Sequence, residues 1–113
     1  MKYSIAVINP SLFEGWSTSV EESKIHDKQI ILSSIPVHIE QSPERGYYFE
    51  AFNYIQLANI LCELNVSYNV RIENQKYEHA KMTALEKISK YGLDFQEIVF
   101  NTIKEKNKCK QKF

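Results

Sequence analysis

The chain has 113 residues, of which 43% are hydrophobic and 25% are charged, with 14 basic and 14 acidic side chains in balance. This composition excludes global disorder, and the length suffices for one modest core. No apolar run approaches the roughly 18 residues of a membrane-spanning helix, and the first residues lack the cleavage pattern of a secretory signal. Two cysteines give no disulfide framework, so we expect a cytoplasmic protein that contacts no membrane.

The charges are unevenly distributed along the chain. Residues 1–75 carry five basic and nine acidic side chains, whereas residues 76–113 carry nine lysines and five acidic side chains. The positive excess lies mainly in residues 104–113, where lysines alternate with polar residues. We expect these ten residues to form a frayed tail, and residues 1–103 to form a single domain.

The first half of the chain predicts a strand, a short helix and a second strand region. Apolar side chains alternate along residues 2–8, which favours a strand that ends at Asn9. Ser19 and Glu22 have the spacing of a capping box, so a helix of about two turns is expected there. Residues 29–40 are rich in β-branched side chains, but Pro36 limits them to an edge strand or to two pieces.

The aromatic stretch that follows has two interpretations. A helix from Ser42 to Leu64 would place Phe49 and Phe52 among polar residues and Gly46 in its first turns. A strand over residues 47–52 suits the aromatics better. It would pair as a hairpin with residues 35–40, leaving Asn53 to cap a helix that ends near Leu64.

The remaining sequence predicts one more strand and two helices. Residues 66–73 alternate apolar and polar side chains, as expected of an antiparallel strand. Helices are predicted over residues 76–91 and 94–106, with Gly92 as the stop between them. The predicted fold is therefore α+β, with a mostly antiparallel sheet of about four strands, helices on one face and a C-terminal helical hairpin.

The sequence contains little that could support catalysis. His38 and Glu40 share one face of the expected strand and could hold a metal or act as a base with its carboxylate, but we expect an ordinary solvent-facing pair. Cys62 falls on the apolar side of its helix, where a thiol is inert. Without a glycine-rich loop or a zinc-type spacing, we expect a protein that is not an enzyme and holds no cofactor and no metal.

Aromatic side chains instead favour protein binding, because binding hot spots are rich in Trp and Tyr. The loop around residues 12–16 has little capacity to bury its aromatics, and a strand over 47–52 would have aromatics on both faces. We therefore expect a non-enzymatic inhibitor or adaptor, such as an immunity protein or a phage or mobile-element anti-defence factor, which could also form a homodimer. The expected binding residues are Phe13, Trp16, Tyr47, Tyr48, Phe49 and Phe52.

Two other functions remain open from the sequence. The lysine-rich tail could neutralise phosphates, which would make the chain a nucleic-acid-binding protein. The residues for that function are Lys104, Lys106, Lys108, Lys110 and Lys112. A small hydrolase or nuclease that uses His38 and Glu40 is the third possibility.

Overall fold

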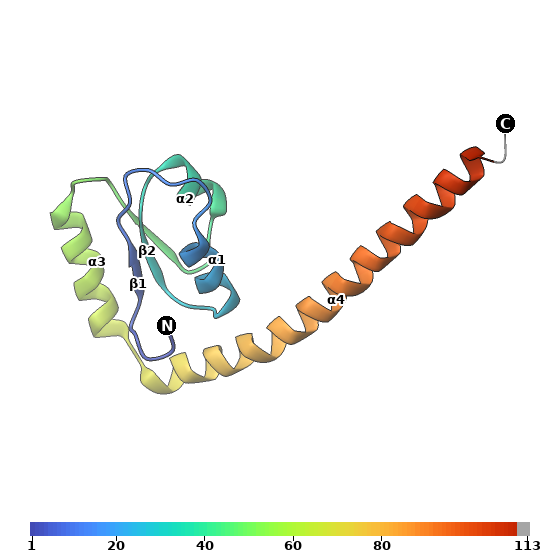
Figure 1. The fold of residues 1–113 in the computed structure, drawn as a ribbon. Coiled ribbons are helices and arrows are strands. Elements are labelled where there is room, and N and C mark those ends of the chain that lie inside the picture. The colour runs from blue at the N-terminus through green and yellow to red at the C-terminus, as the bar shows by residue number, and fades with distance from the viewer. Residues whose placement is uncertain (111–113) are drawn as a thin grey trace. The chain divides into compact units, whose positions relative to one another are not determined.

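The computed structural model describes the backbone of residues 1–110 and the side chains of residues 1–104. The chain divides into two compact units, one from Met1 to Lys81 and one from Met82 onward. The elements, shown in Figure 1, are β1 (Val7–Asn9), α1 (Thr18–Ile25), β2 (Ile30–Ser33), α2 (Pro36–Gln41), β3 (Gly46–Phe49), α3 (Tyr54–Ser67) and α4 (Val70–Lys110).

The first unit contains a three-stranded sheet in the order β1-β2-β3, and both strand pairs are parallel. Val7 pairs with Ile30, and Ile31 pairs with Tyr47. The predicted antiparallel sheet of about four strands is therefore wrong. Because parallel strands need crossover connections, α1 and α2 link successive strands, and every loop that follows a strand lies at the same edge of the sheet.

Helices cover both faces of this sheet rather than one (Figure 1). Side chains of β2 alternate between two cores: Ile30 and Leu32 pack with Val20 of α1, whereas Ile31 packs with Phe49 and Leu64 on the α3 side. All three apolar side chains of β2 are fully buried. Each contributes about 1.5–3 kcal/mol by leaving water, so β2 is the centre of the fold.

The predicted hairpin between residues 35–40 and 47–52 is wrong because residues 36–41 form α2. Pro36 occupies the first turn of this helix, where its fixed φ is favourable and its missing N–H costs nothing. The strand over 47–52 is shorter than predicted, since β3 ends at Phe49. The predicted cap at Asn53 is confirmed, because its Oδ1 accepts a hydrogen bond of 3.0 Å from the Gln56 N–H.

The predicted strand over residues 66–73 is also wrong, since this stretch contains the end of α3 and the start of α4. Asn69, in the middle of this stretch, caps the new helix: its Oδ1 accepts hydrogen bonds from the N–H groups of Arg71 and Ile72, 3.0 and 3.2 Å away. The apolar residues of the pattern gain no sheet partner: Val66 is 87% exposed and Val70 is 59% exposed.

The predicted C-terminal helical hairpin is replaced by the single helix α4, which continues through Gly92. Gly92 has no positive φ, so it does not provide the left-handed residue that ends a helix. Glycine inside a helix costs only about 1 kcal/mol relative to alanine, which the flanking turns can offset. The predicted tail from residue 104 begins within this helix.

Cationic side chains hold the amino edge of the sheet, opposite the loops that follow the strands. Lys28, just before β2, is buried and donates through Nζ to the carbonyl of Ser4. Arg45, just before β3, makes two hydrogen bonds to Glu73 in the first turn of α4, at 2.7 and 3.1 Å. The Arg45–Glu73 contacts fix the start of α4 to the sheet.

Candidate functional site

The carboxyl edge of the sheet brings together three segments: residues 10–17 after β1, residues 34–41 after β2, and residues 50–54 after β3. In parallel α/β sheets this edge is the usual position of a functional site. Here it has two layers, a buried polar network and an exposed aromatic surface above it.

Asn9, at the end of β1, is the centre of the polar network. Its Nδ2 donates to Glu14 Oε1 at 2.7 Å and to Ser17 Oγ at 3.0 Å, while its Oδ1 accepts from the Ser11 N–H at 3.2 Å. The Ser11 hydroxyl also donates to Glu14 Oε1, at 2.6 Å. These bonds close residues 9–17 into a loop whose shape is fixed from within.

Glu14 is ionised within this network. Hydrogen bonds from the side chains of Ser11, Ser17 and Asn9 lower the pKa of its carboxyl group from 4.5 to about 2. Partial burial opposes this shift, but the donors outweigh it. The loop therefore has a fixed negative charge beneath its surface at neutral pH.

Two side chains of α2 complete the network from the neighbouring crossover. Gln41 binds both polar groups of the Ser17 backbone, donating to its carbonyl at 2.9 Å and accepting from its N–H at 3.3 Å. His38 is fully buried and donates from Nδ1 to the Ser33 carbonyl at 2.9 Å. Its Nε2 lies 3.7 Å from Glu14 Oε2, too far for a hydrogen bond but close enough for charge interaction.

The network contains the three residue types of a hydrolase catalytic triad: a nucleophile (Ser33), a base (His38) and a carboxylate (Glu14). The geometry does not support that chemistry. The Ser33 hydroxyl is fully buried and donates to the Ser11 carbonyl, so its proton is directed away from the imidazole. The three residues therefore serve to hold the loop.

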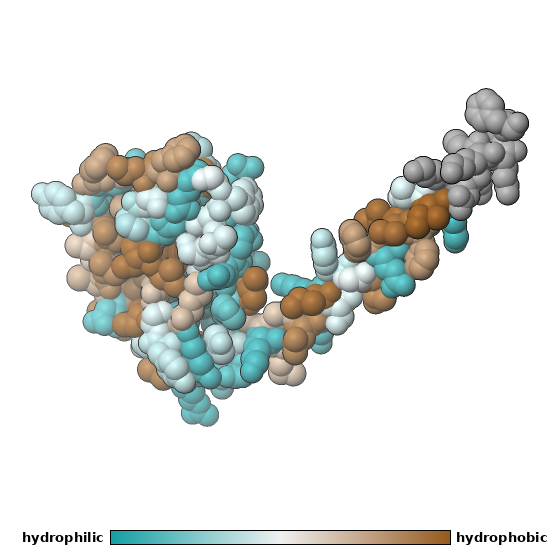
Figure 2. All heavy atoms as spheres, viewed as in Figure 1, coloured by the Kyte–Doolittle hydropathy of each residue, from teal (hydrophilic) through white to brown (hydrophobic). Residues whose placement is uncertain are grey.

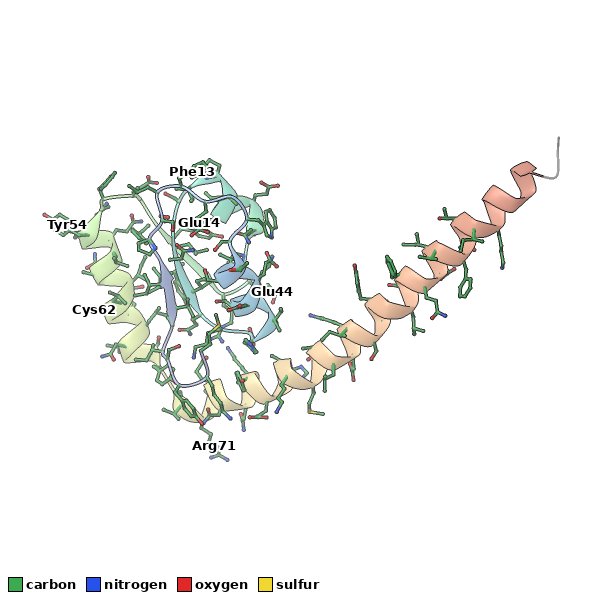
Figure 3. The ribbon with its side chains drawn as sticks, viewed as in Figure 1. Phe13, Glu14, Glu44, Tyr54, Cys62 and Arg71 are labelled. Carbon is green, nitrogen blue, oxygen red and sulfur yellow. The ribbon has the colours of Figure 1, made fainter. Side chains whose placement is uncertain are left out.

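An exposed aromatic surface lies above this network. Phe13 is 88% exposed, Trp16 is 57% exposed and Phe52, from the loop after β3, is 81% exposed. Apolar atoms gather at this end of the unit in Figure 2, and Figure 3 shows Phe13 at the outer edge with Glu14 closer to the strands. We call this set the carboxyl-edge surface; its remaining apolar members are Leu12, Ile39 and Tyr54.

Phe52 also has an unusual backbone conformation, with φ at 69°. A bulky side chain in the left-handed region costs free energy that the surrounding structure must supply. The carboxyl-edge segments carry acidic side chains at Glu14, Glu40 and Glu50 but no lysine or arginine. The aromatic surface is therefore rimmed by negative charge.

The other aromatics of the expected binding set lie elsewhere. Phe49 is buried in the core beneath α3, where Tyr47 packs beside it, and Tyr48 packs against the opposite core. An open sheet face was expected to expose one of these sets, but helices cover both faces. Of the expected binding residues, the structure brings Phe13, Trp16 and Phe52 to one edge.

The two alternative functions depend on His38 with Glu40 and on the lysines from residue 104 onward. His38 is buried whereas Glu40 is exposed, so the expected solvent-facing pair does not form. Lys104 is exposed on α4, and the side chains of Lys106, Lys108, Lys110 and Lys112 lie outside the described residues. Among residues 1–104, no group of three or more His, Cys, Asp or Glu side chains is placed to hold a metal ion.

Sequence reasoning missed the supporting residues Asn9, Ser17 and Gln41. Asn9 followed by Pro10, directly after a strand, was the one local indication of a structured loop. It also missed an apolar groove of about 350 Å³ between β1 and α3, lined mainly by Ile5, Ile8 and Leu61.

No known protein family, curated protein or solved structure matches this chain. Within the part that the structure describes, no helix has the length and apolar character needed to cross a membrane.

Proposed function

We propose that this protein is a non-enzymatic inhibitor or adaptor that binds a basic surface of another protein through its carboxyl-edge surface. The observation that carries this proposal is the exposure of Phe13 and Trp16 on a loop that a hydrogen-bonded network holds in shape. A loop that is already held in shape loses little backbone entropy on binding, which is a property of a preorganised hot spot.

The acidic rim indicates the chemistry of the partner. Glu40 and Glu50 are exposed and flank the aromatics, and no cation lies in the three segments to balance them. A partner with arginine or lysine around an apolar pocket is complementary to this arrangement. Enzymes and effectors that bind nucleic acids have such surfaces, which agrees with an immunity or anti-defence role.

The test begins with capture of partners from a lysate by the immobilised full-length chain, followed by purification of the recovered protein and calorimetric titration. Trp16→Ala is expected to raise the dissociation constant about 30-fold, which corresponds to the roughly 2 kcal/mol of a hot-spot residue. Tyr3→Ala is the matched control, since Tyr3 is 91% exposed but precedes β1 at the opposite edge. Equal effects of the two substitutions would contradict the proposal.

Charge dependence provides the second arm of the test. Replacing Glu40 and Glu50 by glutamine should slow association and flatten its dependence on salt, because rim charges act mainly on the association rate. If the purified chain instead binds nucleic acid in a salt-sensitive manner that is lost on deleting residues 104–113, the lysine-rich tail carries the function. Catalytic turnover lost in His38→Ala would contradict both interpretations.

A further inference from the structure

From Met82 to Lys110 the second unit is a continuous part of α4, and its large apolar side chains up to Ile103 are all solvent-exposed. Ile88 is 68% exposed, Tyr91 is 73% exposed and Phe95 is 59% exposed. Figure 2 shows hydrophobic residues at intervals along this helix. The others are Met82, Leu85, Leu93, Ile98, Val99, Phe100 and Ile103. Since helices in water owe most of their stability to packing, this surface requires a partner.

The spacing of one row of these residues is that of helix pairing. Ala84, Ile88, Tyr91, Phe95 and Ile98 follow one another at alternating steps of four and three residues. Such a row forms the seam of a two-helix coiled coil. Met82, Leu93 and Phe100 lie on another side of the helix and do not belong to this seam.

We propose that the partner of this seam is a second copy of the same chain, whose helix runs antiparallel with the two-fold axis midway between Ile88 and Tyr91. Ile88 of each copy then faces Tyr91 of the other. In the next layer, the large Phe95 faces the small Ala84 of the second copy. Ile98 faces Lys81 of the second copy, whose four-carbon stem can cover it.

The positions that flank the seam are also self-complementary in this register. Leu85 lies across from Gly92 of the second copy, where the absence of a side chain leaves room. Within one copy the space at Gly92 is open, since a Cβ placed there has no other side chain within 4 Å. On the other flank, Lys87 lies across from Asp94 of the second copy. By symmetry each of these pairings occurs twice.

A parallel dimer has none of these advantages. It would place Phe95 against Phe95, Ala84 against Ala84, and Lys87 beside Gly92 rather than beside a carboxylate. Charges at flanking positions set the orientation of paired helices, so the Lys87–Asp94 match favours the antiparallel arrangement. The register also gives Gly92, in the middle of a long helix, a packing role.

Sedimentation velocity over a range of concentrations tests the proposal on the full chain, with circular dichroism confirming the helix content of each variant. We expect a reversible dimer. Lys87→Glu alone and Asp94→Lys alone should each weaken it about tenfold, because each places like charges across the seam twice, and the double variant should recover the affinity. Lys90→Glu, on the polar side of the helix, is the control and should leave the affinity unchanged.

Gly92→Gln separates pairing from helix stability. Glutamine strengthens the isolated helix by replacing a poor helix former, but its side chain fills the space across from Leu85. For Gly92→Gln we therefore expect a more stable helix but a weaker dimer. A chain that stays monomeric at every concentration overturns the proposal. A dimer that is indifferent to the charge reversals, or that Gly92→Gln strengthens, overturns the antiparallel register.

Discussion

Replacing Glu14 by glutamine should destabilise the first unit by an amount that depends on pH. The carboxylate accepts short hydrogen bonds from Asn9 and Ser11, at 2.7 and 2.6 Å, which an uncharged amide oxygen would accept more weakly. The second group of the new amide would be a donor beside buried His38. We therefore expect both a weaker loop and a lower free energy of unfolding.

The magnitude follows from the pKa of Glu14. A decrease from 4.5 to about 2 on folding corresponds to at most about 3.5 kcal/mol, at roughly 1.4 kcal/mol per pH unit. The side chain is 22% exposed, so solvent screening reduces this amount. We expect a loss of about 2 kcal/mol at pH 7.

The sign of the pH dependence is fixed by the direction of the shift. Because the folded pKa lies below the unfolded one, the stabilisation is complete above about pH 4.5 and is lost as the pH falls toward 2. The difference between the wild-type chain and Glu14→Gln should therefore shrink as the solution is acidified from pH 5 to pH 3.

Urea unfolding followed by far-ultraviolet circular dichroism at pH 7, 5, 4 and 3 measures this difference. Glu40→Gln is the control, because Glu40 is exposed at the same edge and its replacement should change stability by less than about 0.5 kcal/mol. A difference for Glu14→Gln that stays constant over this pH range would refute the reasoning, since it would mean that the side chain acts through packing rather than charge.

Two further predictions concern the amino edge and the strained loop. Arg45→Met should lower the free energy of unfolding by about 3–5 kcal/mol, measured by chemical denaturation, because it leaves Glu73, only 10% exposed, without its partner. The double variant Arg45→Met with Glu73→Met should recover part of that loss. No recovery would show that the pair does not act as a unit. Phe52→Asn should raise the free energy of unfolding by roughly 1 kcal/mol, because asparagine tolerates the positive φ better, while it weakens partner binding. A loss of stability in this variant would mean that the Phe52 ring packs against the unit.

Some features of the fold could be predicted from the sequence because they depend only on residues close together in the chain. The cap at Asn53 needs only Gln56 three residues away, and Pro36 marked a break in the second strand region. The strand prediction for residues 66–73 was wrong because the junction of two helices can also give alternating apolar and polar side chains. Asn69 starts a new helix within the pattern, and nothing local to the sequence says that no strand lies alongside to pair with it.

The candidate site was partly readable for the same reason. Phe13 and Trp16 stand in a loop too short to bury them, so their exposure follows from the local sequence. The network beneath them does not, since Gln41 is 24 residues from Ser17. His38 and Glu14 likewise come from different crossovers, and only the parallel order of the strands brings them together. The sequence favoured an antiparallel sheet, which would have separated them.

The parallel order of the strands also separates the stabilising contacts at one edge of the sheet from the exposed aromatics at the other. Lys28 and Arg45 secure the unit at one edge, whereas the aromatics of the first loop lie at the other, at positions that belong to neither buried core. Positions 12, 13, 15 and 16 can therefore change without removing a core side chain, provided that Asn9, Glu14 and Ser17 are kept. The chain is thus a scaffold whose specificity can be redirected, by natural drift or by a randomised library, without renewed selection for folding.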